Sequence, residues 1–110
     1  MKLPNAEQAI VEMSRLVDYC LSSTHFRGRN KARVFQSALG LTVDDAIELQ
    51  EKLKQAARDH HAVEGISDSY GIRFIIDFEM TRNGRTATIR SSWIVPAEGA
   101  SPRMLTCYVL

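Results

Sequence analysis

The spacing of apolar residues changes along the chain from a helical period to strict alternation. Over 13–21 the apolar positions recur three and four residues apart, as on one face of a helix. A second helix is predicted over about 30–39, with Gly40 at the position of a C-terminal cap. Over 72–80, apolar and polar residues alternate in a segment rich in Ile and Phe, which predicts a strand. The sequence therefore predicts helices in the first part of the chain and strands in the second.

A capping signal marks the start of a third helix. Thr42 can accept a hydrogen bond from the first free amides, while Asp45 bonds back to the backbone. We expect this helix to run to about Arg58. The residues that it should bury are Ala46, Leu49, Leu53, Ala56 and Ala57. The polar segment 59–70 is predicted to be a loop. Segment 9–11 is predicted to be either a short extended piece or the start of a helix.

Asn83-Gly84 predicts a two-residue hairpin, because both residues tolerate the positive φ angles of a type I′ turn. The return strand is 86–95, and a last strand is expected over 104–110 after a loop at 96–102. This loop length fixes the register. One face then pairs Phe74 with Trp93, Ile76 with Ser91, Phe78 with Ile89, and Met80 with Ala87. The other face pairs Arg73 with Ile94, Ile75 with Ser92, Asp77 with Arg90, and Glu79 with Thr88.

These elements predict an α+β fold in a single domain, residues 1–110. Two or three N-terminal helices should pack on the apolar face of a C-terminal antiparallel sheet of three or more strands. With 14 Lys and Arg against 13 Asp and Glu, the net charge is +1, so any attraction to nucleic acid depends on local patches. The N-terminus has no apolar signal segment, and Cys20 and Cys107 fit buried thiols of a cytoplasmic protein.

A local patch of this kind occurs between His25 and Arg33. It holds His25, Arg27, Arg29, Lys31 and Arg33 without an acidic residue. One interpretation is a phosphate-binding loop at the start of a helix, with His25 as a neutral base. The other is a solvated turn whose cations pair with Asp44, Asp45 or Glu48.

The polar sheet face carries the second group of candidates, namely Arg73, Asp77, Arg90 and Ser92, to which the last strand adds Thr106 and Tyr108. It reads either as a cross-strand ion pair on a solvated face or as a shallow cationic cleft. A histidine, arginines, a hydroxyl and a phenol suit metal-free RNA cleavage by the 2′-hydroxyl. No cofactor is expected, because common nucleotide and zinc motifs are absent and His60-His61 lacks ligand spacing.

The order of short segments resembles a family of small bacterial domains of unknown function, which occur alone and at the C-terminus of polymorphic toxins. The resemblance covers nearly the whole chain. The segments that carry it are Leu3–Glu7, Leu16–Leu21, His25–Gly28, Lys31–Phe35, Leu39–Thr42, Tyr70-Gly71, Arg90–Ile94 and Leu105–Tyr108.

The layout is similar to the barnase–EndoU–colicin–RelE group of metal-free ribonucleases, many of them toxins held by an antitoxin. By this resemblance an RNA substrate and a cognate antitoxin are the expected partners. From the basic stretch and the polar sheet face themselves, we expect His25 to act as general base or acid and Arg73 and Arg90 to stabilise the phosphate. Tyr108 is the fourth candidate catalytic residue. The candidate substrate-binding residues are Arg27, Arg29, Lys31, Ser92 and Thr106. The alternative is a non-catalytic module that binds a protein through the polar sheet face or the C-terminal strand edge.

Overall fold

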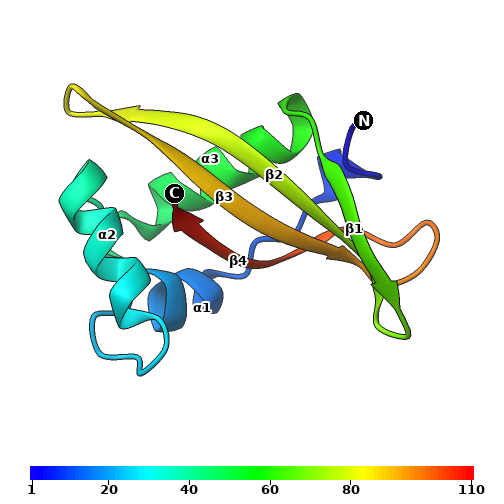
Figure 1. Ribbon diagram of the computed structural model, residues 1–110, viewed down its shortest axis with the longest axis horizontal. Coiled ribbons are helices and arrows are strands. Elements are labelled where there is room, and N and C mark those ends of the chain that lie inside the picture. Colours follow the sequence, from blue (N-terminus) through cyan, green and yellow to red (C-terminus); the bar gives the residue numbers. More distant parts are fainter.

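The computed structural model describes residues 1–110 and places helical segments before a four-stranded sheet (Figure 1). The helical elements are the 3₁₀ turns η1 (Ala6–Gln8) and η3 (Val43–Asp45), the π-helix η2 (Leu16–Cys20), and α1 (Met13–Arg15), α2 (Arg29–Leu39) and α3 (Ala46–Asp59). The strands are β1 (Val63–Asp68), β2 (Gly71–Arg82), β3 (Arg85–Val95) and β4 (Arg103–Val109). The predicted α+β class is confirmed.

The sheet has the order β1-β2-β3-β4, and every neighbouring pair is antiparallel. Asn83 and Gly84 have φ angles of 53° and 75°, and the hairpin register is the predicted one throughout. In β4, Thr106 lies opposite Ser92 and Tyr108 lies opposite Arg90. The polar face predicted from the hairpin therefore continues across β4.

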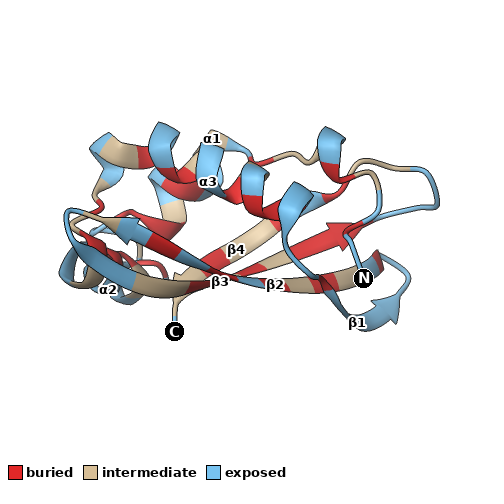
Figure 2. Ribbon diagram, turned by 90° about the horizontal axis from the view of Figure 1, so that it is seen from above, coloured by how far each residue is buried: buried red, intermediate tan, exposed pale blue.

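Helix α3 covers the apolar face of the sheet, as Figure 2 shows from above, and α2 packs beside β3 and β4. All five apolar positions predicted for α3 are buried against Trp93 and the other core residues. Both predicted helix boundaries are present. Gly40 caps α2 with a φ of 68°, and Thr42 and Asp45 form the capping box. No helix has the length and apolarity to cross a membrane.

The prediction of a loop over 59–70 was wrong, because this segment contains β1. Every residue of β1 is exposed, so the strand has no apolar alternation to reveal it. The strand forms because the chain lies beside β2 and pairs with it, and a bulge between Glu64 and Ser67 interrupts this pairing. The first predicted helix is also irregular, since α1 passes directly into the π-helix η2. Segment 9–11 is extended, with Ile10 bridged in parallel to Arg103.

Candidate functional site

His25 organises the turn that leads into α2. Its Nδ1 atom accepts hydrogen bonds from the backbone N–H groups of Arg27 and Gly28, both at 3.0 Å. The backbone N–H of His25 donates to Ser22 Oγ at 3.1 Å. Since Nδ1 acts as an acceptor, the neutral ring carries its proton on Nε2. In this tautomer Nε2 is the ring atom left to donate a hydrogen bond, which suits the acid role among the two roles expected for His25.

Gly28 is needed because the turn passes close to the π-helix. A Cβ atom at this position would lie 2.0 Å from the carbonyl oxygen of Tyr19, which is main chain and cannot move aside cheaply. Arg29 already belongs to α2, so only the first part of the basic stretch is a turn. The close approach holds His25 against Tyr19, with ring centroids 4.9 Å apart in an edge-on arrangement.

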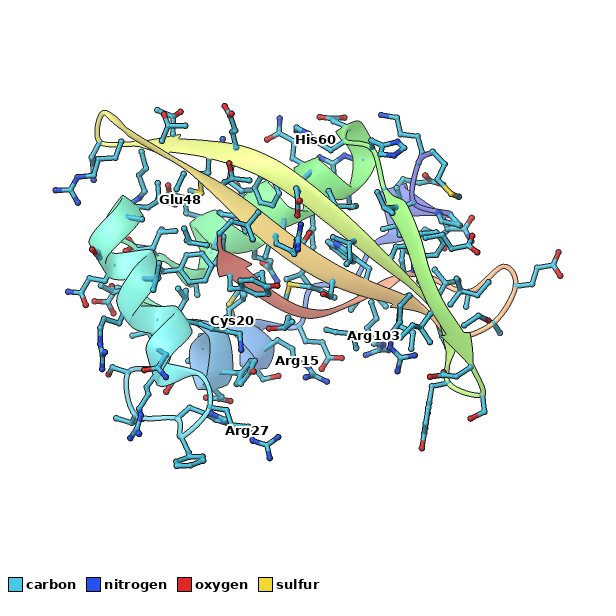
Figure 3. All side chains as sticks on the ribbon, viewed as in Figure 1. Arg15, Cys20, Arg27, Glu48, His60 and Arg103 are labelled. Atoms are coloured by element: carbon cyan, nitrogen blue, oxygen red, sulfur yellow. The ribbon has the colours of Figure 1, made fainter.

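An open cavity of about 840 Å³ lies between this turn, the first helical segment and β4. Its walls are formed by Ser14, Arg15, Asp18, Tyr19, His25, Phe26, Arg27, Leu105 and Thr106. Arg15 and Arg27 lie on the same side of the molecule in Figure 3. Neither forms an ion pair, although Arg15 donates a hydrogen bond of 3.4 Å to the carbonyl of Leu105, and the Phe26 side chain is 76% exposed. Guanidinium groups without a carboxylate partner, beside an exposed ring, can hold a phosphate and stack a base.

Lys31 connects this cavity to the outer face of the sheet. Its Nζ atom donates to Tyr19 Oη at 2.8 Å and lies 4.9 Å from the centroid of the Tyr19 ring. The same ammonium lies 5.9 Å from the ring centroid of Tyr108, and the two residues border a neighbouring hollow of about 380 Å³. Lys31 thus stands between two phenols, one in each hollow.

Behind the cavity wall, Cys20 of η2 and Cys107 of β4 are free, buried thiols, as predicted. Cys20 Sγ lies 3.8 Å from Thr106 Oγ1. Hydrogen bonding from the Cys107 thiol outweighs burial and lowers the pKa of Cys20 to about 7. The same bond, together with burial, raises the pKa of Cys107. These contacts join the π-helix to β4, the two elements that hold Tyr19 and Thr106 in the cavity.

The two arginines of the sheet face are both occupied by carboxylates. Arg90 makes two hydrogen bonds of 2.9 Å to Asp77, which lower the pKa of Asp77 and raise that of Arg90. Arg73 pairs with Asp68 at 2.6 Å. The backbone N–H of Tyr70 and the Arg73 guanidinium lower the pKa of Asp68. The sheet face is therefore a set of compensated ion pairs.

The structure divides the predicted site residues among several places. His25, Arg27 and Thr106 share the large cavity, and Lys31 and Tyr108 share the adjoining hollow. Arg90 and Ser92 lie on the sheet face opposite Tyr108 and Thr106. Arg29 lies over the Phe26 ring, 5.5 Å from its centroid. Arg73 stays apart at the β1–β2 end, held by Asp68.

Sequence reasoning missed several residues of the cavity, chiefly Arg15, Asp18, Tyr19 and Phe26. Arg15 and Asp18 are three residues apart, on either side of the buried residue Leu16. Their spacing on the polar side of a predicted helix was the available signal. The suggested pairing of the basic stretch with Asp45 and Glu48 is not observed, since Arg82 binds both carboxylates.

The family model described as "Domain of unknown function (DUF6883)" matches residues 2–110. The chain belongs to the DUF6883 family. This DUF6883 chain is similar in structure to a chain of a contact-dependent growth inhibition toxin–immunity protein complex from Klebsiella pneumoniae 342. The TM-score is 0.70 at 18% sequence identity, and the match covers 97% of each chain. At this identity the match shows a shared fold. No curated protein matches the chain.

Proposed function

We propose that this protein is a metal-independent ribonuclease, a toxin-like domain that a partner protein neutralises. The observation that carries the proposal is the open cavity in which Arg15 and Arg27, without carboxylate partners, lie beside Asp18, His25 and the exposed ring of Phe26. RNA cleavage requires cations that bind the phosphate, an aromatic face that stacks on a base, and groups that exchange protons.

The reaction is attack by a ribose 2′-oxygen on the adjacent phosphorus. The O2′–P bond forms and the P–O5′ bond breaks, which leaves a 2′,3′-cyclic phosphate and a free 5′-hydroxyl. One group must accept the proton of the 2′-hydroxyl, and another must deliver a proton to O5′. Negative charge grows on the phosphate oxygens in the transition state, so fixed donors there accelerate the step.

The geometry supports specific roles for the cavity residues. Asp18 is the carboxylate on the cavity wall and accepts the proton of the 2′-hydroxyl. Tyr19 receives a hydrogen bond from Lys31, which leaves its own O–H free to protonate O5′. Lys31 then balances the charge on the phenol oxygen. His25, with Nδ1 engaged by the turn, donates from Nε2 to the phosphate beside Arg27.

The partner and the place of action belong to the same proposal. The chain shares its fold with a member of a toxin–immunity complex, which supports neutralisation by a bound protein. Because the proposed substrate is RNA, we propose that the protein acts in the cytoplasm. Expression of the chain alone is expected to arrest growth.

Incubation of purified protein with total RNA in EDTA tests the proposal. We expect cleavage, and a loss of about 100-fold in rate for Asp18→Asn and for Tyr19→Phe. Arg27→Ala should weaken cleavage mainly through substrate binding. Arg58→Ala is the matched control. Arg58 is exposed near the end of α3, so this substitution removes the same charge outside the cavity. Absence of cleavage at high protein concentration, or equal losses in Arg27→Ala and Arg58→Ala, would refute the assignment.

A further inference from the structure

The sheet has one open edge, at β1. This strand pairs with β2 alone, and its other side forms no hydrogen bond to the rest of the protein. The opposite edge is covered in part. Ile10 donates to the carbonyl of Pro102 at 2.8 Å and accepts from the N–H of Met104 at 2.9 Å, while α2 and η2 pack along the rest of β4.

The open edge is exposed and partly apolar. All six residues of β1 are exposed, including Val63 at 56% and Ile66 at 71%. The strand contains no Lys, Arg or Pro, the residues that usually protect a free edge from pairing. The bulge between Glu64 and Ser67 interrupts the strand, so regular pairing with an added segment is limited to a few residues on either side of it. Figure 2 shows β1 as a continuous exposed ribbon at the margin of the molecule.

A cavity of about 430 Å³ adjoins this edge. Its walls are formed by Pro4, Ser67, Asp68, Gly71, Ile72, Phe74, Val95, Pro96, Ala97, Glu98 and Gly99. Ser67 and Asp68 belong to β1, so a strand added beside β1 would place a side chain opposite Ser67 next to the cavity. Peptides that extend a sheet gain affinity from main-chain hydrogen bonds and specificity from side-chain pockets. This end of the protein provides both.

Charge distinguishes the possible occupants. The cavity wall holds Asp68 and Glu98 and no Lys or Arg, and β1 adds Glu64. Asp68 is paired with Arg73, whereas Glu64 and Glu98 form no ion pair. A second copy of β1 would bring the same acidic side chains to the new pair of strands, which is unfavourable. A segment with basic residues complements this edge.

We propose that the β1 edge binds an extended segment of another protein, with an apolar side chain in the adjoining cavity and Lys or Arg residues flanking it. The segment pairs along β1 and makes the sheet five-stranded. This surface is separate from the large cavity, which lies beside η2, the His25 turn and β4. The inference does not depend on the nuclease proposal, since its test measures binding.

The probe is the acetylated and amidated peptide Lys-Lys-Val-Phe-Val-Lys-Lys, titrated into the ¹⁵N-labelled full chain. We expect saturable binding in the micromolar range, with amide shifts confined to β1, the β1–β2 turn and 96–99. Glu64→Lys and Glu98→Lys should each weaken binding by about tenfold. Glu51→Lys is the matched control, because it makes the same charge change on the exposed side of α3 and should change the affinity by less than about twofold.

Two peptide variants separate pairing from simple charge attraction. N-methylation of both Val amides removes main-chain donors and should abolish binding, and Phe replaced by Ser should weaken it by about tenfold. Equal binding of the methylated peptide, equal loss in Glu51→Lys, shifts centred elsewhere, or no saturable binding would each overturn the proposal. A concentration-dependent dimer whose shifts map to β1 would assign the edge to a second copy and would overturn it as well.

Discussion

Replacing His25 separates its structural role from its chemical one. In His25→Ala the backbone N–H groups of Arg27 and Gly28 lose their acceptor, and the edge-on contact with Tyr19 disappears. Each hydrogen bond contributes about 1 kcal/mol and the ring contact about 0.5 kcal/mol. Because His25 is half-buried, water compensates part of this loss. We expect His25→Ala to lower the free energy of unfolding by about 2 kcal/mol, which lowers the Tm by about 10 °C.

His25→Asn is the matched variant. The Asn side chain offers an acceptor oxygen to the same two backbone amides, as such residues do in turns and helix caps, but it lacks the Nε2–H group. We expect His25→Asn to lose less than about 1 kcal/mol in thermal or urea unfolding and still to lose RNA cleavage. If His25→Asn is as unstable as His25→Ala, the turn does not depend on the Nδ1 acceptor. If it is stable and cleaves RNA at the normal rate, His25 has no part in the chemistry.

Three further predictions concern stability. Arg82→Ala should lower the free energy of unfolding by about 2–3 kcal/mol, because the Arg82 guanidinium bonds two carbonyls at the end of α2 and two carboxylates. Arg85→Ala is its control: Arg85 makes one hydrogen bond of 3.3 Å, so its loss should lower that free energy by less than about 1 kcal/mol in urea unfolding. Ser91→Ala should cost about 2 kcal/mol by calorimetry, since its buried hydroxyl accepts from the indole N–H of the single tryptophan; a loss below about 0.5 kcal/mol would contradict this. Arg90 lowers the pKa of Asp77, so this pair stabilises the fold above the ordinary Asp pKa and the contribution is lost as the pH falls below about 4. Asp77→Asn should remove that part of the pH dependence, and identical stability curves for the variant and the wild type would refute it.

The parts of the fold set by local chemistry were predictable from the sequence. The Asn83-Gly84 turn requires positive φ angles, and its two-residue length fixed the whole β2–β3 register. Thr42 and Asp45 marked the start of the third helix in the same way. In each case a few adjacent residues determine the outcome.

Features set by tertiary contacts were not predictable from local patterns. Strand β1 has no buried residue, so its existence depends on the exposed edge of β2. The cation that binds Asp45 and Glu48 is Arg82, brought there by the hairpin, and the basic stretch lies elsewhere. For the candidate site, His25 and Arg27 of the basic stretch line the large cavity, and Asp18 and Tyr19 reach it from the π-helix that precedes the stretch. Of the two interpretations of the sheet face, the ion pair is present, since Arg90 binds Asp77 and Arg73 binds Asp68.

The central claim is most directly tested by the ends of the RNA that the protein produces. An RNA oligonucleotide that is cleaved in EDTA should yield a 2′,3′-cyclic phosphate and a 5′-hydroxyl, identified by mass spectrometry. The same oligonucleotide with a single 2′-deoxy residue at the cleaved position should remain intact. Cleavage of the deoxy-substituted strand at that position, or products with a 5′-phosphate, would contradict attack by the 2′-hydroxyl and the roles assigned to the cavity.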